Sequence, residues 1–287
     1  MSDRSIKVLV GSGGFYEGPR WHDGRWWVSD FYRHTVFGIT EEGEQEAILQ
    51  VAQQPSGLGW LSDGTMLIVS MKDRRLLRRT TDGKVDEVAD LSALATWHLN
   101  DMVVDQRGRA WIGNFGFDIM SGGAPAMANI IRVDPDGTAT VAAEDMNFPN
   151  GSVVTPDGQT LIVGESGALR YTAFTIATDG SLVDRRVWAQ MSDPPVAPDG
   201  CCLDAEGCIW AADALGNRCV RVAEGAAILD EIRPPEGLGV YACMLGGSNG
   251  KTLLMCAAPG FLEDDRTSAN DAMLLAAEVE VPHAGCP

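Results

Sequence analysis

Residues 148–163 read FPNGSVVTPDGQTLIV, and this stretch contains the pattern that decides the fold. Two short apolar runs, residues 152–155 and 160–163, flank an Asp157-Gly158 turn, an arrangement that predicts a β-hairpin. A polar residue, Asn150, stands just before the first run. We expect the functional side chains to occupy this position, at the head of the first strand.

The same hairpin pattern recurs six times along the chain. By subtraction, its turn glycines are 40, 44, 50, 49 and 43 residues apart, at Gly24, Gly64, Gly108, Gly158, Gly207 and Gly250. A second acidic-Gly turn follows in each of the first five units, so each of these contains four strand-like runs. Such repeats are typical of β-propeller blades. The sequence therefore predicts an all-β, six-bladed β-propeller that forms one domain over residues 1–287.

The sixth unit lacks the second turn and ends in a single long strand-like run, residues 272–281. Residues 6–10 form another strand-like run, which precedes the first unit and belongs to no other blade. Pairing these two runs would complete the sixth blade and leave no unpaired edge in the ring. We therefore expect the N-terminal strand to close the propeller.

The composition restricts the partners and the compartment. Forty Asp and Glu against 22 Lys and Arg give a net charge of −18, which disfavours nucleic acid and anionic membranes as partners. No signal-peptide pattern is present, and no apolar run approaches the roughly 18 residues of a membrane-spanning helix. Seven cysteines without a Cys-x-x-Cys motif indicate reduced, mostly buried thiols. We expect a cytoplasmic protein, either a monomer or a small homo-oligomer.

Equivalent positions in different blades of a propeller lie next to one another around its central channel. The position eight residues before the turn glycine is held by Asn100, Asn150 and Asp199, and Glu17 holds it with a one-residue shift. Two carboxylates and two carboxamides offer only oxygen ligands, which suit a hard cation such as Ca²⁺, Mg²⁺ or Mn²⁺. Asn, Asp and Gly are also ordinary turn formers. This structural alternative applies most directly to Asn150 and Asp199, because a glycine follows each of them.

Two insertions, residues 115–128 and 259–270, fall between the second and third strands of the third and sixth units. Loops at this point of a blade open on the face where the innermost strands begin, so we expect both insertions to border the channel mouth. Large apolar residues expected at this mouth are Trp97, Phe115, Phe117, Met120, Met146, Phe148, Met191, Tyr241 and Phe261.

Other catalytic centres have little support in the sequence. The four histidines are scattered, and no Gly-x-Ser-x-Gly motif is present. His98 lies near the expected site, two residues before Asn100, although a lone histidine is more often a structural contact. Cys202 and Cys243 fall on expected inner strands, but a nucleophilic cysteine needs a basic partner that the sequence does not show.

In sequence order, these motifs resemble the gluconolactonase–regucalcin (senescence marker protein) family, which includes proteins similar to luciferin-regenerating enzyme. The resemblance covers nearly the whole chain. It is carried by EGPRW at residues 17–21, WVSD at 27–30, ND at 100–101, PNG at 149–151 and PDG at 198–200. It implies a six-bladed propeller with one catalytic divalent cation that hydrolyses a lactone or a related ester.

By position, the resemblance implies that Glu17, Asn150 and Asp199 bind the metal. Asn100 would bind the metal or the substrate and take part in catalysis, and Asp199 would also be the general base. The expected cation is Ca²⁺, and Zn²⁺, Mn²⁺, Mg²⁺ and Fe²⁺ are alternatives.

The chain departs from the family at His98, where sugar-lactone members often have an arginine. We expect the substrate to be a small lactone or ester that contacts His98, Asn100, Phe115, Phe117, Phe148 and Tyr241. The aromatic and Met residues of the rim favour an apolar or aromatic lactone over a polar sugar lactone.

Two other classes of function stay open, because a shared fold does not fix the reaction. One is a non-catalytic propeller that binds a ligand or a protein on its loop-bearing face. The other is a metal-dependent phosphoester hydrolase, lyase or isomerase. Assaying lactones, aryl esters and phosphotriesters with several metals distinguishes these classes.

Overall fold

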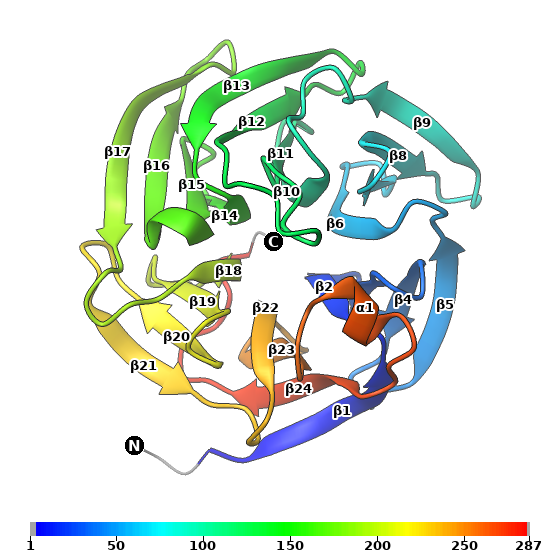
Figure 1. Ribbon diagram of the computed structural model, residues 1–287, viewed down its shortest axis with the longest axis vertical. Coiled ribbons are helices and arrows are strands. Elements are labelled where there is room, and N and C mark those ends of the chain that lie inside the picture. The colour runs from blue at the N-terminus through cyan, green and yellow to red at the C-terminus, as the bar shows by residue number, and fades with distance from the viewer. Residues whose placement is uncertain (1–3, 286–287) are drawn as a thin grey trace.

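The computed structural model describes residues 4–285 and contains six four-stranded antiparallel sheets arranged as a ring (Figure 1). Figure 1 shows one strand of each sheet, β2, β6, β10, β14, β18 or β22, nearest the centre. The predicted six-bladed β-propeller is confirmed. Helix is confined to α1 (Glu263–Arg266) and the 3₁₀ turn η1 (Ser166–Ala168) within the described residues. Neither is long enough to cross a membrane.

Five blades follow one another along the chain, each numbered from its innermost strand outward. Blade 1 contains β2 (Tyr16–His22), β3 (Arg25–Asp30), β4 (Thr35–Ile39) and β5 (Gln45–Gln50). Blade 2 contains β6 (Pro55–Trp60), β7 (Met66–Ser70), β8 (Arg75–Arg79) and β9 (Val85–Asp90). Blade 3 contains β10 (Leu99–Val104), β11 (Ala110–Asn114), β12 (Ala128–Val133) and β13 (Ala139–Met146). Blade 4 contains β14 (Pro149–Val154), β15 (Thr160–Glu165), β16 (Arg170–Ile176) and β17 (Leu182–Gln190). Blade 5 contains β18 (Pro198–Leu203), β19 (Ile209–Asp213), β20 (Arg218–Val222) and β21 (Ile228–Ile232).

The sixth blade joins the two ends of the chain, as the sequence predicts. It contains β22 (Gly239–Gly246), β23 (Thr252–Ala258), β24 (Ala272–Glu278) and β1 (Ile6–Gly13). β1 pairs with β24 in antiparallel orientation, from Ile6 opposite Ala277 to Gly13 opposite Ala272. This pairing covers the edge that β24 would otherwise expose.

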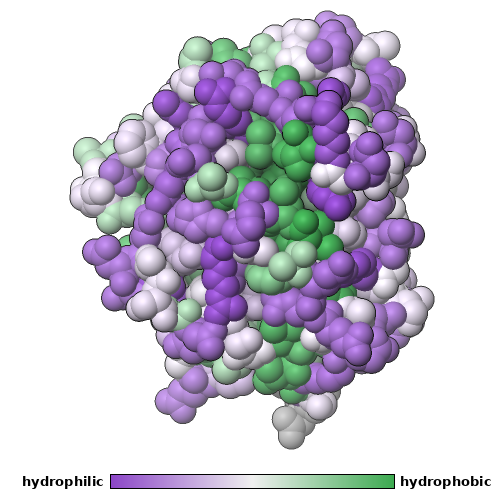
Figure 2. Space-filling view, turned by 90° about the vertical axis from the view of Figure 1, so that its right-hand side faces the viewer, coloured by the Kyte–Doolittle hydropathy of each residue, from purple (hydrophilic) through white to green (hydrophobic). Residues whose placement is uncertain are grey.

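Burial decreases from the centre of the ring to its rim. Every residue of β14, β18 and β22 is buried, whereas the outer strands β5 and β9 are mostly exposed or half-buried. Figure 2 shows the side of the ring on which β5 and β9 lie; it is mainly hydrophilic, with hydrophobic residues in a band down its middle. All six described cysteines are free and buried, as expected, and Cys286 lies outside the described residues.

The innermost strands share an irregularity directly after their second residue. In β14, Pro149 pairs with Glu165 and Ser152 pairs with Val163. Between these two pairs β14 advances by three residues and β15 by only two, so β14 contains one extra residue. β2, β6, β10 and β18 have the same one-residue bulge at the same place. A β-bulge bends its strand and re-aims nearby side chains. The bulge therefore lies at the second residue of these strands or directly after it.

A glycine inside this bulge allows neighbouring blades to approach closely. A Cβ atom on Gly151 would lie 2.5 Å from the carbonyl oxygen of Asp199, and one on Gly200 would lie 2.5 Å from the Cβ of Ala242. Both glycines lie within strands, β14 and β18. The glycines after Asn150 and Asp199 therefore serve contact between blades, and the turn-former interpretation does not hold for them.

Candidate active site

Four polar residues meet at one end of the ring. Glu17, Asn100, Asn150 and Asp199 are each the second residue of an innermost strand, namely β2, β10, β14 and β18. All four line one cavity of about 430 Å³. The one-residue shift of Glu17 reflects a hairpin that is one residue shorter in blade 1, because its position within the strand is the same.

The two carboxyl groups of the site are buried without a cationic partner. Burial raises the pKa of Glu17 well above its usual value, and the neighbouring Asp199 and Asp101 raise it further. Burial raises the pKa of Asp199 to about 8, with a further contribution from Asp101. Among residues 4–285, no Lys, Arg or His forms an ion pair with Glu17 or Asp199. Protons or a bound cation must therefore offset these charges.

The two carboxamides of the site are held through their nitrogen atoms. The Nδ2 of Asn100 donates to the carbonyl oxygen of Pro149 at 3.4 Å, and the Nδ2 of Asn150 donates to Ser166 Oγ at 3.4 Å. Ser166 Oγ in turn donates to the carbonyl oxygen of Pro198 at 2.6 Å. Both amide nitrogens are thus engaged by the protein, and within residues 4–285 no side-chain hydrogen bond involves either amide oxygen, so each could act as an acceptor or a ligand.

A buried ion pair lies next to the site and was not found from the sequence. Arg20 Nη2 lies 2.8 Å from Asp101 Oδ1, and the two side chains are only 3% and 6% exposed. Arg20 also donates to the carbonyl oxygens of Pro19 and Met102, while Asp101 accepts from the Met102 backbone at 2.8 Å. The guanidinium therefore links β2 to β10 across the ring. Its positive charge also lowers the pKa of Glu17, but burial and the neighbouring Asp199 and Asp101 outweigh this effect.

The donor set fits a hard divalent cation. Within the described chain, no three His, Cys, Asp or Glu side chains are grouped to hold a metal ion. The candidate site instead combines two buried carboxylates that lack a cationic partner with two carboxamide oxygens. Oxygen donors of this kind suit Ca²⁺, Mg²⁺ or Mn²⁺. Glu17, Asn150, Asp199 and Asn100 are therefore the residues that could hold such an ion.

Aromatic side chains form a large part of the lining of this cavity. Five of the aromatic residues expected from the sequence line it, namely Phe115, Phe117, Phe148, Tyr241 and Phe261. The expected Met120 lines it as well. The rings of Phe115 and Phe148 are stacked with centroids 5.1 Å apart and planes 21° apart. The lining thus includes a packed set of rings.

Sequence reasoning missed three aromatic residues of blade 1 that also line the cavity, Phe15, Phe31 and Tyr32. Phe15 stands two residues before Glu17, and its ring lies 5.0 Å from that of Tyr241. Phe31 and Tyr32 directly follow β3. Phe31 and Tyr32 lie between the second and third strands of their blade, the same place at which the two insertions occur in other blades. This position could have identified them as residues of the cavity.

Other expected mouth residues lie elsewhere. Met146 and Met191 are 0% and 2% exposed and belong to hydrophobic clusters between strands, so the expectation that they border the mouth is wrong. Each stands at the end of an outer strand or just after it, where the chain turns back into the core. Trp97 and His98 do not line the cavity; their rings stack at 5.0 Å, and the His98 ring lies 6.3 Å from that of Phe115. A role of His98 in substrate binding stays a prediction.

The insertion at residues 259–270 is fixed against blades 1 and 2. Tyr32 Oη donates to the carbonyl oxygen of Phe261 at 2.7 Å, and Arg266 donates to the carbonyl oxygen of Gly14 at 2.7 Å. Lys72 Nζ lies 2.6 Å from Glu263 Oε1. These bonds hold Phe261 at the cavity, so the prediction that this insertion borders the mouth is confirmed.

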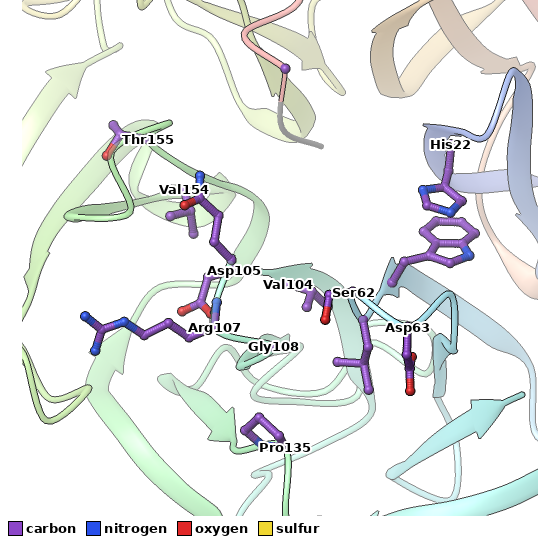
Figure 3. Close-up of a pocket in the computed structure, with 14 residues that line it drawn as sticks. His22, Ser62, Asp63, Val104, Asp105, Arg107, Gly108, Pro135, Val154 and Thr155 are labelled. Carbon is purple, nitrogen blue, oxygen red and sulfur yellow. The ribbon is translucent and has the colours of Figure 1, made fainter.

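A second cavity, of about 480 Å³, lies among the hairpin turns at the opposite ends of the innermost strands (Figure 3). His22 stacks on Trp60 there, with ring centroids 4.3 Å apart. Its buried acid, Asp105, accepts hydrogen bonds from Arg109 Nε at 2.7 Å and from the Trp111 indole at 3.1 Å. This carboxylate is satisfied by the protein, which distinguishes it from Glu17 and Asp199.

Fold and site together define a six-bladed propeller whose inner strands gather two buried carboxylates and two carboxamides in a cavity lined by aromatic side chains. The chain belongs to the SMP-30/Gluconolactonase/LRE-like family, whose characteristic region matches residues 15–259. The resemblance seen in the sequence is thereby confirmed. A pentonolactonase of Haloferax volcanii is 28% identical over 210 residues, which cover 71% of this chain and 68% of that protein.

Solved structures have the same fold. A calcium-binding protein, regucalcin, from Agrobacterium tumefaciens superposes with a TM-score of 0.83 at 23% identity, covering 99% of this chain and 97% of that one. A luciferin-regenerating enzyme superposes with a TM-score of 0.82 at 18% identity, covering 98% of this chain and 97% of that one. At these identities the superpositions establish the architecture alone.

Proposed function

We propose that this protein is a hydrolase of lactones or related carboxylic esters that works with one divalent cation. Family membership and the similarity to a pentonolactonase support hydrolysis of a lactone. The observation that carries the cation requirement is the burial of Glu17 and Asp199 in one cavity with Asn100 and Asn150, without an ion-pair partner among the described residues.

In this proposal Glu17, Asn150 and Asp199 hold the cation, and Asn100 contacts the cation or the substrate. A bound divalent cation supplies Lewis-acid polarisation of the substrate carbonyl and stabilises the developing negative charge. Ca²⁺ is the expected ion because all the donors are oxygen atoms. The calcium-binding regucalcin with the same fold agrees with this choice.

Asp199 acts as the general base by accepting a proton from the water that attacks the substrate carbonyl. This role requires an ionised carboxylate, and a neighbouring positive charge lowers the pKa of such a buried group. Asn100 orients the ring oxygen or the carbonyl oxygen of the substrate. The aromatic side chains that line the cavity limit the access of bulk water to the reacting centre and so strengthen the electrostatic interactions within it.

The test is a substrate panel of lactones, aryl esters and phosphotriesters, measured before and after treatment with a chelator and again after adding back Ca²⁺, Mn²⁺ or Mg²⁺. We expect lactone or ester hydrolysis that the chelator abolishes and that a divalent cation restores. A metal-free protein that retains full activity in chelator would refute the cation site. Turnover of phosphotriesters alone would assign the site to phosphoester chemistry instead.

A further inference from the structure

We propose that the substrate carries an uncharged hydrophobic substituent, alkyl or aryl, beside its reacting carbonyl. This inference rests on the proposed lactone or ester hydrolysis and adds the chemical class of the rest of the molecule. It follows from how polar and apolar groups are divided over the cavity.

Apart from the two tyrosines, six residues that line the cavity have polar side chains. They are the four candidate site residues together with Asn147 and Ser166, which stand at the same end of blade 4. Almost all of the remaining lining is apolar and includes Phe15, Phe31, Phe115, Phe117, Phe148 and Phe261. No Lys, Arg or His is among the lining residues in the described chain. We call the six phenylalanines, with Tyr32 and Tyr241, the aromatic wall.

Two of the few polar side chains beside the aromatic wall are already used by the protein. Tyr32 Oη donates to the carbonyl oxygen of Phe261, and Ser166 Oγ donates to that of Pro198. Among the polar groups of the lining outside the four candidate site residues, this leaves the Tyr241 hydroxyl and the Asn147 amide, too few to replace all the hydrogen bonds to water that a sugar lactone placed against this wall would give up. Each hydroxyl left unpaired in this way should weaken binding by about 5- to 150-fold.

The cavity also disfavours a charged substituent on the substrate. An anionic group would find no basic side chain in the lining, and the charge of the proposed divalent cation is already offset by Glu17 and Asp199. A hydrophobic group gains about fourfold in affinity for each methylene that it buries fully. A cavity of about 430 Å³ is also within the size range of pockets that enclose drug-sized ligands, about 300–1,000 Å³. The wall therefore favours a neutral lactone or ester that is considerably larger than its reacting ring.

The experiment compares kcat/KM for four lactones: γ-butyrolactone, its γ-hexyl and γ-phenyl derivatives, and glucono-δ-lactone. We expect both hydrophobic derivatives to exceed γ-butyrolactone by at least about a hundredfold if four or more carbons are buried. Glucono-δ-lactone should fall below γ-butyrolactone. If glucono-δ-lactone is instead the best substrate, the hydrophobic substituent is refuted while the hydrolase function stands.

A binding measurement keeps the inference testable without turnover. The lactam 5-phenyl-2-pyrrolidinone resists hydrolysis, and its Kd is compared by calorimetry with that of 2-pyrrolidinone. We expect the phenyl compound to bind at least about tenfold more tightly. Tight phenyl binding without hydrolysis of any lactone or ester would refute the proposed function but support the hydrophobic ligand. Equal Kd values would overturn the hydrophobic ligand.

Two adjacent residues provide a matched pair of variants. Phe261 lines the cavity and is 36% exposed, whereas Leu262 is 43% exposed and does not line it. Phe261→Ala should lower the ratio of kcat/KM between the γ-hexyl lactone and γ-butyrolactone by about tenfold, and Leu262→Ala should leave this ratio unchanged. Thermal unfolding of both variants checks that the fold is intact. The same ratio in both variants and the wild type would contradict a role of the wall in substrate choice.

Discussion

Replacing Asp199 by Asn separates the two effects that this carboxyl group should have. The amide can still offer an oxygen ligand but cannot accept a proton from water. We therefore expect the variant to bind the divalent cation while kcat on the best lactone falls at least about a hundredfold. Wild-type turnover in this variant would show that Asp199 is not the base.

The same substitution should stabilise the cation-free protein at alkaline pH. Burial raises the pKa of Asp199 from 3.8 to about 8. A raised pKa in the folded state means that the group's contribution to stability is complete below pH 3.8 and is lost as the pH rises through 8. About three pH units of this loss lie between pH 5 and pH 8. Between pH 5 and pH 8, the free energy of unfolding of the cation-free wild type should therefore fall by on the order of 4 kcal/mol, whereas the variant should not show this decrease.

Urea denaturation in the presence of chelator measures this difference at pH 5 and at pH 9. The control is Asp184→Asn, on the exposed part of the outer strand β17, which should follow the wild type. If the free energies of unfolding of the wild type and Asp199→Asn change in parallel between the two pH values, the buried carboxyl group does not titrate as described. The opposite signs of the two effects, lower turnover and higher stability, rule out general damage as their cause.

Binding of the divalent cation should depend on pH, because the cation displaces protons from Asp199 and Glu17, whose pKa values are both raised by burial. Below about pH 8, the affinity for the cation should fall about tenfold per pH unit for each proton displaced. Calorimetry in buffers of different ionisation enthalpy counts the displaced protons. A Kd for the cation that stays constant between pH 6 and pH 8 would contradict this prediction. Arg20→Met should cost about 3–5 kcal/mol of unfolding free energy at pH 7, because it leaves Asp101 buried and unpaired. Arg25→Met breaks an ion pair with the exposed Glu46 and should cost much less in the same denaturation assay, so equal losses would argue against the buried pair.

The architecture could be predicted from the sequence because every blade repeats the same turn chemistry. The acidic-Gly turns locate the strands, and the leftover run at residues 6–10 identifies the closing strand, observed as β1. Rotational repetition also brings Glu17, Asn100, Asn150 and Asp199 together, since equal positions in equal units become neighbours. The gathering of these four residues in one cavity could be predicted for the same reason, although no single motif among them is specific.

Features that depend on contacts between blades could not be predicted. Asn150-Gly151 has the composition of a turn, and only the approach of β18 to β14 shows why glycine is required there. Met146 and Met191 follow the same local pattern as the true wall residues but turn into the core. The partnership of Arg20 with Asp101 joins residues 81 positions apart in the chain, and neither position indicates the other.

Closure by β1 also determines how the ring responds to tension applied at the two ends of the chain. Ile6 lies opposite Ala277, so the beginning of β1 is beside the end of β24. Tension applied at this shared end loads the hydrogen bonds of the pair one after another, as in opening a zipper, instead of loading them all at once in shear. After β24, the backbone of Val279 donates to Lys251, that of His283 to Gly250 and that of Ala284 to Leu203. These three hydrogen bonds lie between the β1–β24 pair and the C-terminal end of the chain. Tension transmitted through the C-terminal end therefore reaches them before it reaches the hydrogen bonds between β1 and β24.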